Sequence, residues 1–211
     1  MTHHHEPGPP AGPNGSATQT YSAEGGAPVT VVDLASACVK FVERAVGVRL
    51  DYTPETLPLL DHYLAQARSA AAARPEAGPL LAQAAGAYFG EVVRRRHAAW
   101  WRTEGDDPTF WRVELEAVYL AFCPVMTIQD ALSLPEGDAE GESRLELTEE
   151  DREAVAARLA ELPEVDLEEY FAPTTRLEVI DIAVEAIRAR KMAAGEHADE
   201  AFGPADYEGS A

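Results

Sequence analysis

The run GAYFGEVVRRRHAAWWR, residues 86–102, places two glycines four residues apart directly before the main basic segment of an acidic chain. Residues at this spacing lie on one face of a helix, where each interior glycine costs about 1 kcal/mol relative to alanine. Gly86 and Gly90 are therefore expected where a neighbouring helix or strand packs closely. Apolar residues on both sides of this helix, predicted from about Pro79 to Trp100, indicate that it is buried centrally.

Charge and composition limit the possible partners. The chain has 211 residues, and its hydrophobic content of 46% is enough for the core of one ordinary domain. Its formal net charge is −20, which argues against nucleic acids and anionic membranes because both bind cationic surfaces. Residues 136–211 contain 22 acids and 7 bases, against 15 acids and 10 bases in residues 1–135. The C-terminal third is therefore expected to form the acidic face.

Targeting and cysteine patterns favour a bacterial, cytoplasmic protein. No apolar run approaches the roughly 18 residues of a membrane span, and the first residues lack the charged-then-apolar pattern of a secretory signal. We therefore expect no membrane partner. Cys38 and Cys123 lie far apart in apolar stretches, which is typical of buried free thiols rather than of a metal or redox pair.

The chain is predicted to contain one folded domain between two tails. Residues 1–28 are rich in proline and glycine with almost no large apolar side chains, so we expect a disordered tail. Residues 29–194 form the predicted single domain, and residues 195–211 the predicted flexible acidic tail. The histidines at 3–5 could chelate a divalent metal weakly, but we predict no metal site from three histidines on a flexible leader.

Helical periodicity dominates the domain. The predicted helices span about 30–47, 53–74, 79–100, 127–134, 148–163 and 173–192. The second has the clearest start, because Thr53 can cap it, Pro54 suits its first position and Glu55 lies at its positive end. Thr148 and Asp151 resemble a capping box with Asp in place of Glu or Gln. Leu162 is assigned to the buried side of that helix.

A sheet is predicted after the turn at residues 104–108. Trp111, Val113, Leu115 and Ala117 alternate with charged residues, as in a strand with one solvated face. Residues 118–126 are almost continuously apolar and predict a buried strand that Pro124 interrupts or confines to an edge. The predicted fold class is α+β, with a helical pair or bundle packed on a small antiparallel sheet and further helices at the C-terminus.

The basic segment has two interpretations. The predicted binding residues are Arg94, Arg95, Arg96, Trp100, Trp101 and Arg102. They could form a docking surface, in which arginine makes paired hydrogen bonds to an anion and tryptophan stacks on it or anchors an interface. Alternatively, the arginines stabilise the helix C-terminus and pair with carboxylates of residues 136–211. Adjacent tryptophans cannot both face one core, so at least one is expected to be partly exposed.

Glu91 follows Gly90 on a helix that is predicted to be buried. An unpaired carboxylate would be costly there, so we expect an ion pair with Arg94, Arg95 or another basic residue. General acid–base chemistry with His97 is the alternative, although the spacing alone does not produce that geometry. The sequence contains no Gly-x-Ser-x-Gly, phosphate-loop or metal-ligand spacing. We therefore expect no cofactor and no metal, and we favour a non-enzymatic protein over an enzyme.

Two stretches carry a resemblance to known proteins. They are LDYTPETLPLLD, residues 50–61, and GAYFGEVVRR, residues 86–95, the latter followed by tryptophan and an alternating strand. Over about residues 30–135 the chain resembles a group of bacterial domains of unknown function. The resemblance implies an α+β domain with a helical pair on a small antiparallel sheet, and it implies no activity. The acidic part after Glu136 departs from that group.

Two functional hypotheses follow. The leading one is a non-enzymatic interaction or regulatory module that binds a protein partner, for which an acidic immunity-type inhibitor of a basic toxin is one example by charge. The alternative is a small enzyme or ligand-binding protein with a pocket around Glu91, Arg94 and His97.

Overall fold

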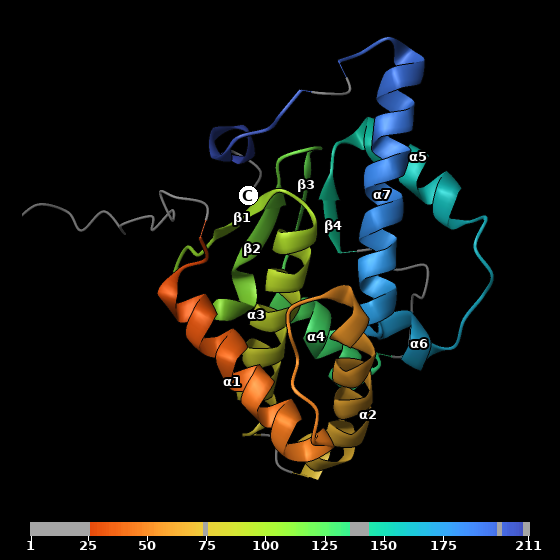
Figure 1. The fold of residues 1–211 in the computed structure, drawn as a ribbon. Coiled ribbons are helices and arrows are strands. Elements are labelled where there is room, and N and C mark those ends of the chain that lie inside the picture. The colour runs from red at the N-terminus through yellow and green to blue at the C-terminus, as the bar shows by residue number, and fades with distance from the viewer. Residues whose placement is uncertain (1–25, 74–75, 136–143, 198–199, 209–211) are drawn as a thin grey trace, which may run out of the picture.

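The computed structural model describes residues 26–73, 76–135, 144–197 and 200–208, and it confirms the α+β fold class (Figure 1). The helices are α1 Val29–Val46, α2 Leu57–Ala73, α3 Gly78–Arg96, α4 Pro124–Ser133, α5 Glu149–Leu159, α6 Leu167–Phe171 and α7 Pro173–Ala194. The strands are β1 Ala99–Arg102, β2 Arg112–Leu115, β3 Leu120–Phe122 and β4 Leu145–Leu147, and single 3-10 turns cover Pro54–Thr56, Pro108–Phe110 and Pro204–Tyr207.

The four strands form one antiparallel sheet in the order β1-β2-β3-β4. The register pairs Trp101 with Val113 and Val113 with Phe122. Because neighbours in register point to the same side of a sheet, these three side chains share one apolar face. Trp100 and Glu114, one residue earlier and later on their strands, share the opposite face.

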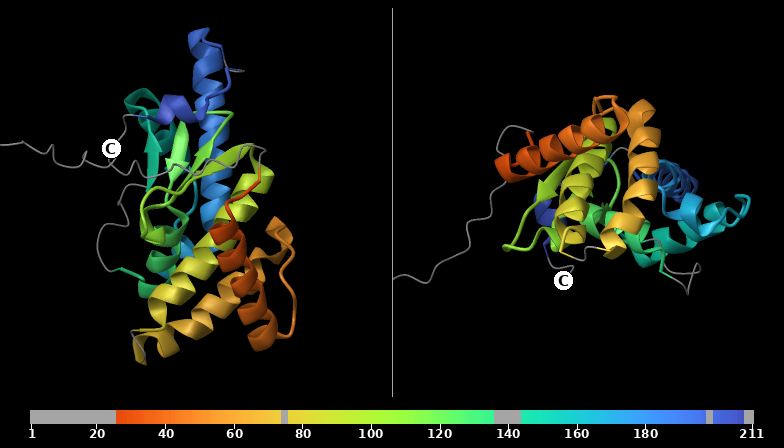
Figure 2. Two further views of the ribbon diagram at one scale, coloured as in Figure 1. Left: turned by 90° about the vertical axis from the view of Figure 1, so that its left-hand side faces the viewer. Right: turned by 90° about the horizontal axis from the view of Figure 1, so that it is seen from below.

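The central helix α3 covers the apolar face. Residues 84–93 of α3 are buried without interruption, and the ring of Phe89 meets that of Phe122 at 5.9 Å between centroids. Helices α1 and α4 pack on other sides of α3, and α2 lies beside them, so that α3 is enclosed (Figure 2). The prediction that this helix is central and buried is confirmed.

Both helix glycines mark the predicted close approach. A methyl group added at Gly86 would lie 2.6 Å from the Cα of Val125 in α4. One added at Gly90 would overlap the indole of Trp101 on β1 and touch Pro124. The neighbours are thus a helix at Gly86 and a strand residue at Gly90, which is why neither position has a side chain.

Several predicted boundaries are wrong. Helix α3 ends at Arg96 rather than near Trp100, because residues 99–102 pair with β2 as the strand β1. The predicted strand over residues 118–126 is only β3, since Pro124 occupies the first position of α4 instead of an edge strand. Strand β4 had no counterpart in the prediction, because three residues are too few for an alternating pattern.

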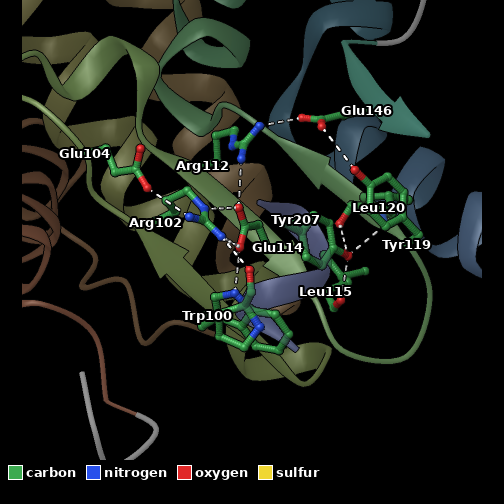
Figure 3. Close-up of polar contacts among 11 residues, drawn as sticks. Trp100, Arg102, Glu104, Arg112, Glu114, Leu115, Tyr119, Leu120, Glu146 and Tyr207 are labelled. Atoms are coloured by element: carbon green, nitrogen blue, oxygen red, sulfur yellow. Dashed lines mark hydrogen bonds and ion pairs between the residues drawn. The ribbon is translucent and has the colours of Figure 1, made fainter. Parts of the chain in front are cut away.

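The predicted C-terminal tail is ordered over residues 200–208. The amide of Phe202 donates to the carbonyl of Glu116 at 2.8 Å. The hydroxyl of Tyr207 accepts from the amide of Leu120 at 3.0 Å and donates to the carbonyl of Leu115 at 2.7 Å (Figure 3). Burial raises the pKa of Tyr207. This segment covers the second face of the sheet, so the expectation of a solvated strand face and of a flexible tail is wrong here.

The predicted N-terminal tail also ends earlier than residue 28. Pro28 is buried and Ala27 packs partly against the core, so the folded domain begins before Val29. The remainder of that tail, residues 1–25, lies outside the described residues. The first helix ends as predicted, with Gly47 in the left-handed conformation at φ 78°.

We predict that Gly90→Ala lowers the free energy of unfolding by about 1–3 kcal/mol, because the new methyl group forces the buried indole of Trp101 to move. The higher helix propensity of alanine, worth about 1 kcal/mol, offsets only part of the cost of this overlap. Urea denaturation measures the change. Gly78→Ala is the matched control, since a methyl group there meets nothing within 4 Å. Equal stability of the two variants would contradict the predicted contact.

Candidate functional site

The carboxylate of Glu91 is buried and fully engaged. Arg94 donates from Nε to Oε1 at 2.7 Å and from Nη2 to Oε2 at 3.1 Å. The indole Nε1 of Trp101 donates to Oε1 at 2.9 Å. This arrangement confirms the predicted structural ion pair, and it shows that β1 supplies one of the donors.

Arg95 joins residues 50–61 to residues 86–95. Its guanidinium lies 4.0 Å above the ring of Tyr52, and its Nε is 3.6 Å from Glu91. Tyr52 adopts φ 66°, which is uncommon for a residue other than glycine. Its amide donates to the hydroxyl of Tyr88 at 3.0 Å, and that hydroxyl also meets Thr56 at 3.0 Å. These contacts hold the unusual backbone at Tyr52 in place.

Arg96 and His97 both contact Asp181 of α7. Arg96 donates from Nε to Oδ1 at 2.8 Å, and Nε2 of His97 lies 2.8 Å from the same oxygen. Burial lowers the pKa of His97, and the bond to Asp181 opposes this shift without cancelling it. The end of α3 is thereby joined to a helix more than eighty residues away in sequence.

A second buried carboxylate, Glu114, lies on the far face of the sheet (Figure 3). It accepts from Trp100 Nε1 at 2.7 Å, from Arg102 Nε at 2.5 Å and from Arg112 Nη2 at 3.0 Å. Arg102 is buried too, and its Nη2 donates to the carbonyl of Pro204 at 2.7 Å. The C-terminal segment therefore closes over this ion pair.

The expectation that the basic segment presents free guanidinium groups is wrong. Arg94, Arg96 and Arg102 each bind a carboxylate of their own chain, because a buried or half-buried cation requires a counter-charge. Internal pairing was the alternative interpretation, but only Asp181 among these partners belongs to residues 136–211. Binding of a partner by Arg95 and Arg96, whose side chains stay exposed, remains a prediction.

The adjacent tryptophans separate as expected. Trp101 is buried against Gly90, whereas Trp100 is half-buried and meets the ring of Tyr207 at 6.0 Å. They point to opposite faces because they lie on a strand, not on a helix end. Both serve the interior of this chain through their indole N–H groups.

The proposed pocket residues do not converge. Glu91 and Arg94 form one pair, while His97 has Asp181 as its partner. Both oxygens of Glu91 accept hydrogen bonds from Arg94 or Trp101, and none comes from His97.

The described residues contain no group of three or more His, Cys, Asp or Glu side chains that could hold a metal ion. The histidines at 3–5 lie outside these residues. Cys38 is buried, which raises the pKa of its thiol to about 12, and Cys123 is half-buried with a raised pKa. Both thiols are free and protonated at neutral pH, although Cys123 is less buried than predicted.

A surface that the sequence did not predict covers the connection from α5 to α6 and the start of α6. Residues 160–169, here called the acidic segment, are all exposed. They contain five acids and no base. Leu162 was assigned to a buried helix face, but α5 ends at Leu159 and leaves Leu162 46% exposed. Figures 1 and 2 show this connection at the outer edge of the molecule, beside α7.

No protein-family model, curated protein or solved structure matches this chain. Within the described residues, no helix combines the length and the apolar character needed to cross a membrane.

Glu114→Gln is predicted to lower the free energy of unfolding by about 3–5 kcal/mol, since it leaves the buried Arg102 without its main counter-charge. Glu104 bonds the same guanidinium at 2.8 Å but is half exposed. Glu104→Gln is therefore the control, with an expected loss of at most about 1 kcal/mol. Chemical denaturation of both variants measures the difference, and similar losses would refute the assignment.

We predict that His97 makes the free energy of unfolding fall in mild acid. Because folding lowers its pKa, the unfolded chain binds the proton more readily. Stability is then lost as the pH falls below the ordinary histidine value of about 6.5. Urea unfolding at pH 7, 6 and 5 should show a shallower decline for His97→Asn than for the wild type. A steeper decline in the variant would contradict the lowered pKa.

Proposed function

We propose that this protein is a non-enzymatic interaction module that binds a basic protein partner through the acidic segment. The observation that carries the proposal is the combination of exposed apolar side chains and five acids without a base at residues 160–169. Single exposed apolar residues are normal on protein surfaces. Here Leu162, Val165 and Leu167 are 46%, 39% and 38% exposed within six positions.

Only some carboxylates of the acidic segment form ion pairs with described residues of the chain. Glu161 pairs with Arg158 and Glu168 with Arg68. Glu164 and Glu169 have no side-chain ion pair with any residue that the structure describes. A basic partner would gain electrostatic steering from these carboxylates, while the apolar side chains would supply contact area on docking.

The interior supports a non-enzymatic role. The buried carboxylates Glu91 and Glu114 are each occupied by arginine and indole donors, and His97 is bonded to Asp181. General acid–base catalysis needs a group that is free to exchange a proton with a substrate. These three side chains instead serve internal contacts.

The proposal includes a setting and a partner class. We place the interaction in a bacterial cytoplasm, without nucleic acid. We also propose that the chain belongs to the group of bacterial domains that residues 50–61 and 86–95 resemble. A basic toxin inhibited by this chain fits the proposed charge complementarity by analogy. The −20 net charge supports a cationic partner of this kind.

A photo-crosslinking amino acid at position 165 tests the surface in cells. We expect a covalent adduct with a specific basic protein, and no such adduct from position 48, where Val48 is similarly exposed on another part of the chain. The isolated partner should then bind purified wild-type protein with an affinity that falls as salt rises.

Glu164→Gln/Glu169→Gln should weaken that complex about tenfold, equivalent to about 1.4 kcal/mol, and flatten its salt dependence. Asp33→Asn/Glu43→Gln removes the same charge from exposed positions on α1 and should leave the affinity unchanged. Equal weakening by both double variants would show that net charge alone attracts the partner. Adducts from position 48 alone would place the interaction elsewhere and overturn the proposal.

A further inference from the structure

Arg176 is an exception to the internal pairing of buried cations. It is the fourth residue of α7, close to the corner between α6 and α7 (Figure 1). Its Nε and Nη2 atoms are buried, and neither has a hydrogen-bond partner among the described residues. Its guanidinium lies 3.9 Å above the ring of Tyr170, which fixes the plane of the group without neutralising it.

This arrangement is unfavourable for the chain alone. Arginine does not lose its proton in proteins, so the charge persists. The first turn of α7 contains no acid, and a cation near a helix N-terminus faces the positive end of the helix dipole. Buried Arg102, by contrast, bonds two carboxylates and a carbonyl.

A shortage of acids does not explain the difference. The chain has 37 acids and 17 bases, yet within the described part of the molecule none of those carboxylates reaches the guanidinium of Arg176. Its third nitrogen, Nη1, has no hydrogen bond to a described residue and is not one of the buried unpaired atoms, so it keeps some contact with solvent. The group thus has one nitrogen in contact with solvent and two buried donors without acceptors.

We propose that Arg176 binds a small oxyanion, either a phosphate or a carboxylate group, on the side of its guanidinium where Nη1 contacts solvent. Two oxygens of such an anion match the paired N–H groups of Nη1 and Nη2. Binding through Nη2 requires the side chain to tilt toward solvent, because that atom is buried in the present position over Tyr170. The site does not depend on the proposed protein partner.

Thermal unfolding in sodium phosphate and in sodium acetate, each at an ionic strength held constant with sodium chloride, tests this site. A ligand at about ten times its Kd should raise the Tm of the wild type by about 3–6 °C. The Arg176→Gln variant should lose the rise. Arg152→Gln is the matched control, because Arg152 is also half-buried and is not paired with any described residue, and it should keep the rise.

The side-chain Nε–H signal of Arg176 in NMR spectra provides a direct readout. It should shift on titration with the anion that stabilises the protein. A response to phosphate but not to acetate identifies a phosphate ligand, and the reverse identifies a carboxylate. No stabilisation by either anion, or the same stabilisation in Arg176→Gln, would overturn the proposal.

Discussion

The contact between the indole of Trp101 and the backbone of Gly90 determines how the sheet meets the helices. The indole occupies the space that a side chain at position 90 would fill, and its N–H bonds the carboxylate of the next residue, Glu91. One side chain therefore joins β1 to α3 by packing and by a hydrogen bond. The apolar face around Val113 and Phe122 then lies against the same helix.

Burial of charge follows one rule on both faces of the sheet. Glu91 accepts hydrogen bonds from Arg94 and Trp101. Glu114 accepts them from Arg102, Arg112 and Trp100. Each buried carboxylate is costly alone and acceptable only with several donors. Arg94 and Arg102 of the basic segment meet this requirement, and excess negative charge remains on outer segments such as residues 160–169.

The same balance of buried and exposed charge underlies both proposed binding sites. Buried side-chain nitrogen and oxygen atoms in the described part of the chain find partners, with the exception of two atoms of Arg176. The acidic segment shows the opposite imbalance, since Glu164 and Glu169 are exposed without a cation among the described residues. We propose a small anion as the ligand of the first and a basic protein surface as the partner of the second, so the two proposed sites attract opposite charges.

Local signals in the sequence predicted one strand and every helix of the described residues except the short α6, because periodicity, Gly47, Pro54 and Pro173 act within a few residues. They also predicted a close neighbour at the two α3 glycines and a partner for Glu91. Tertiary structure alone decided that residues 99–102 form a strand and that Tyr207 covers the sheet. It also decided that Arg96 pairs with Asp181 and Arg102 with Glu114. Those outcomes depend on contacts between segments tens of residues apart, and such contacts leave no periodic pattern in the sequence.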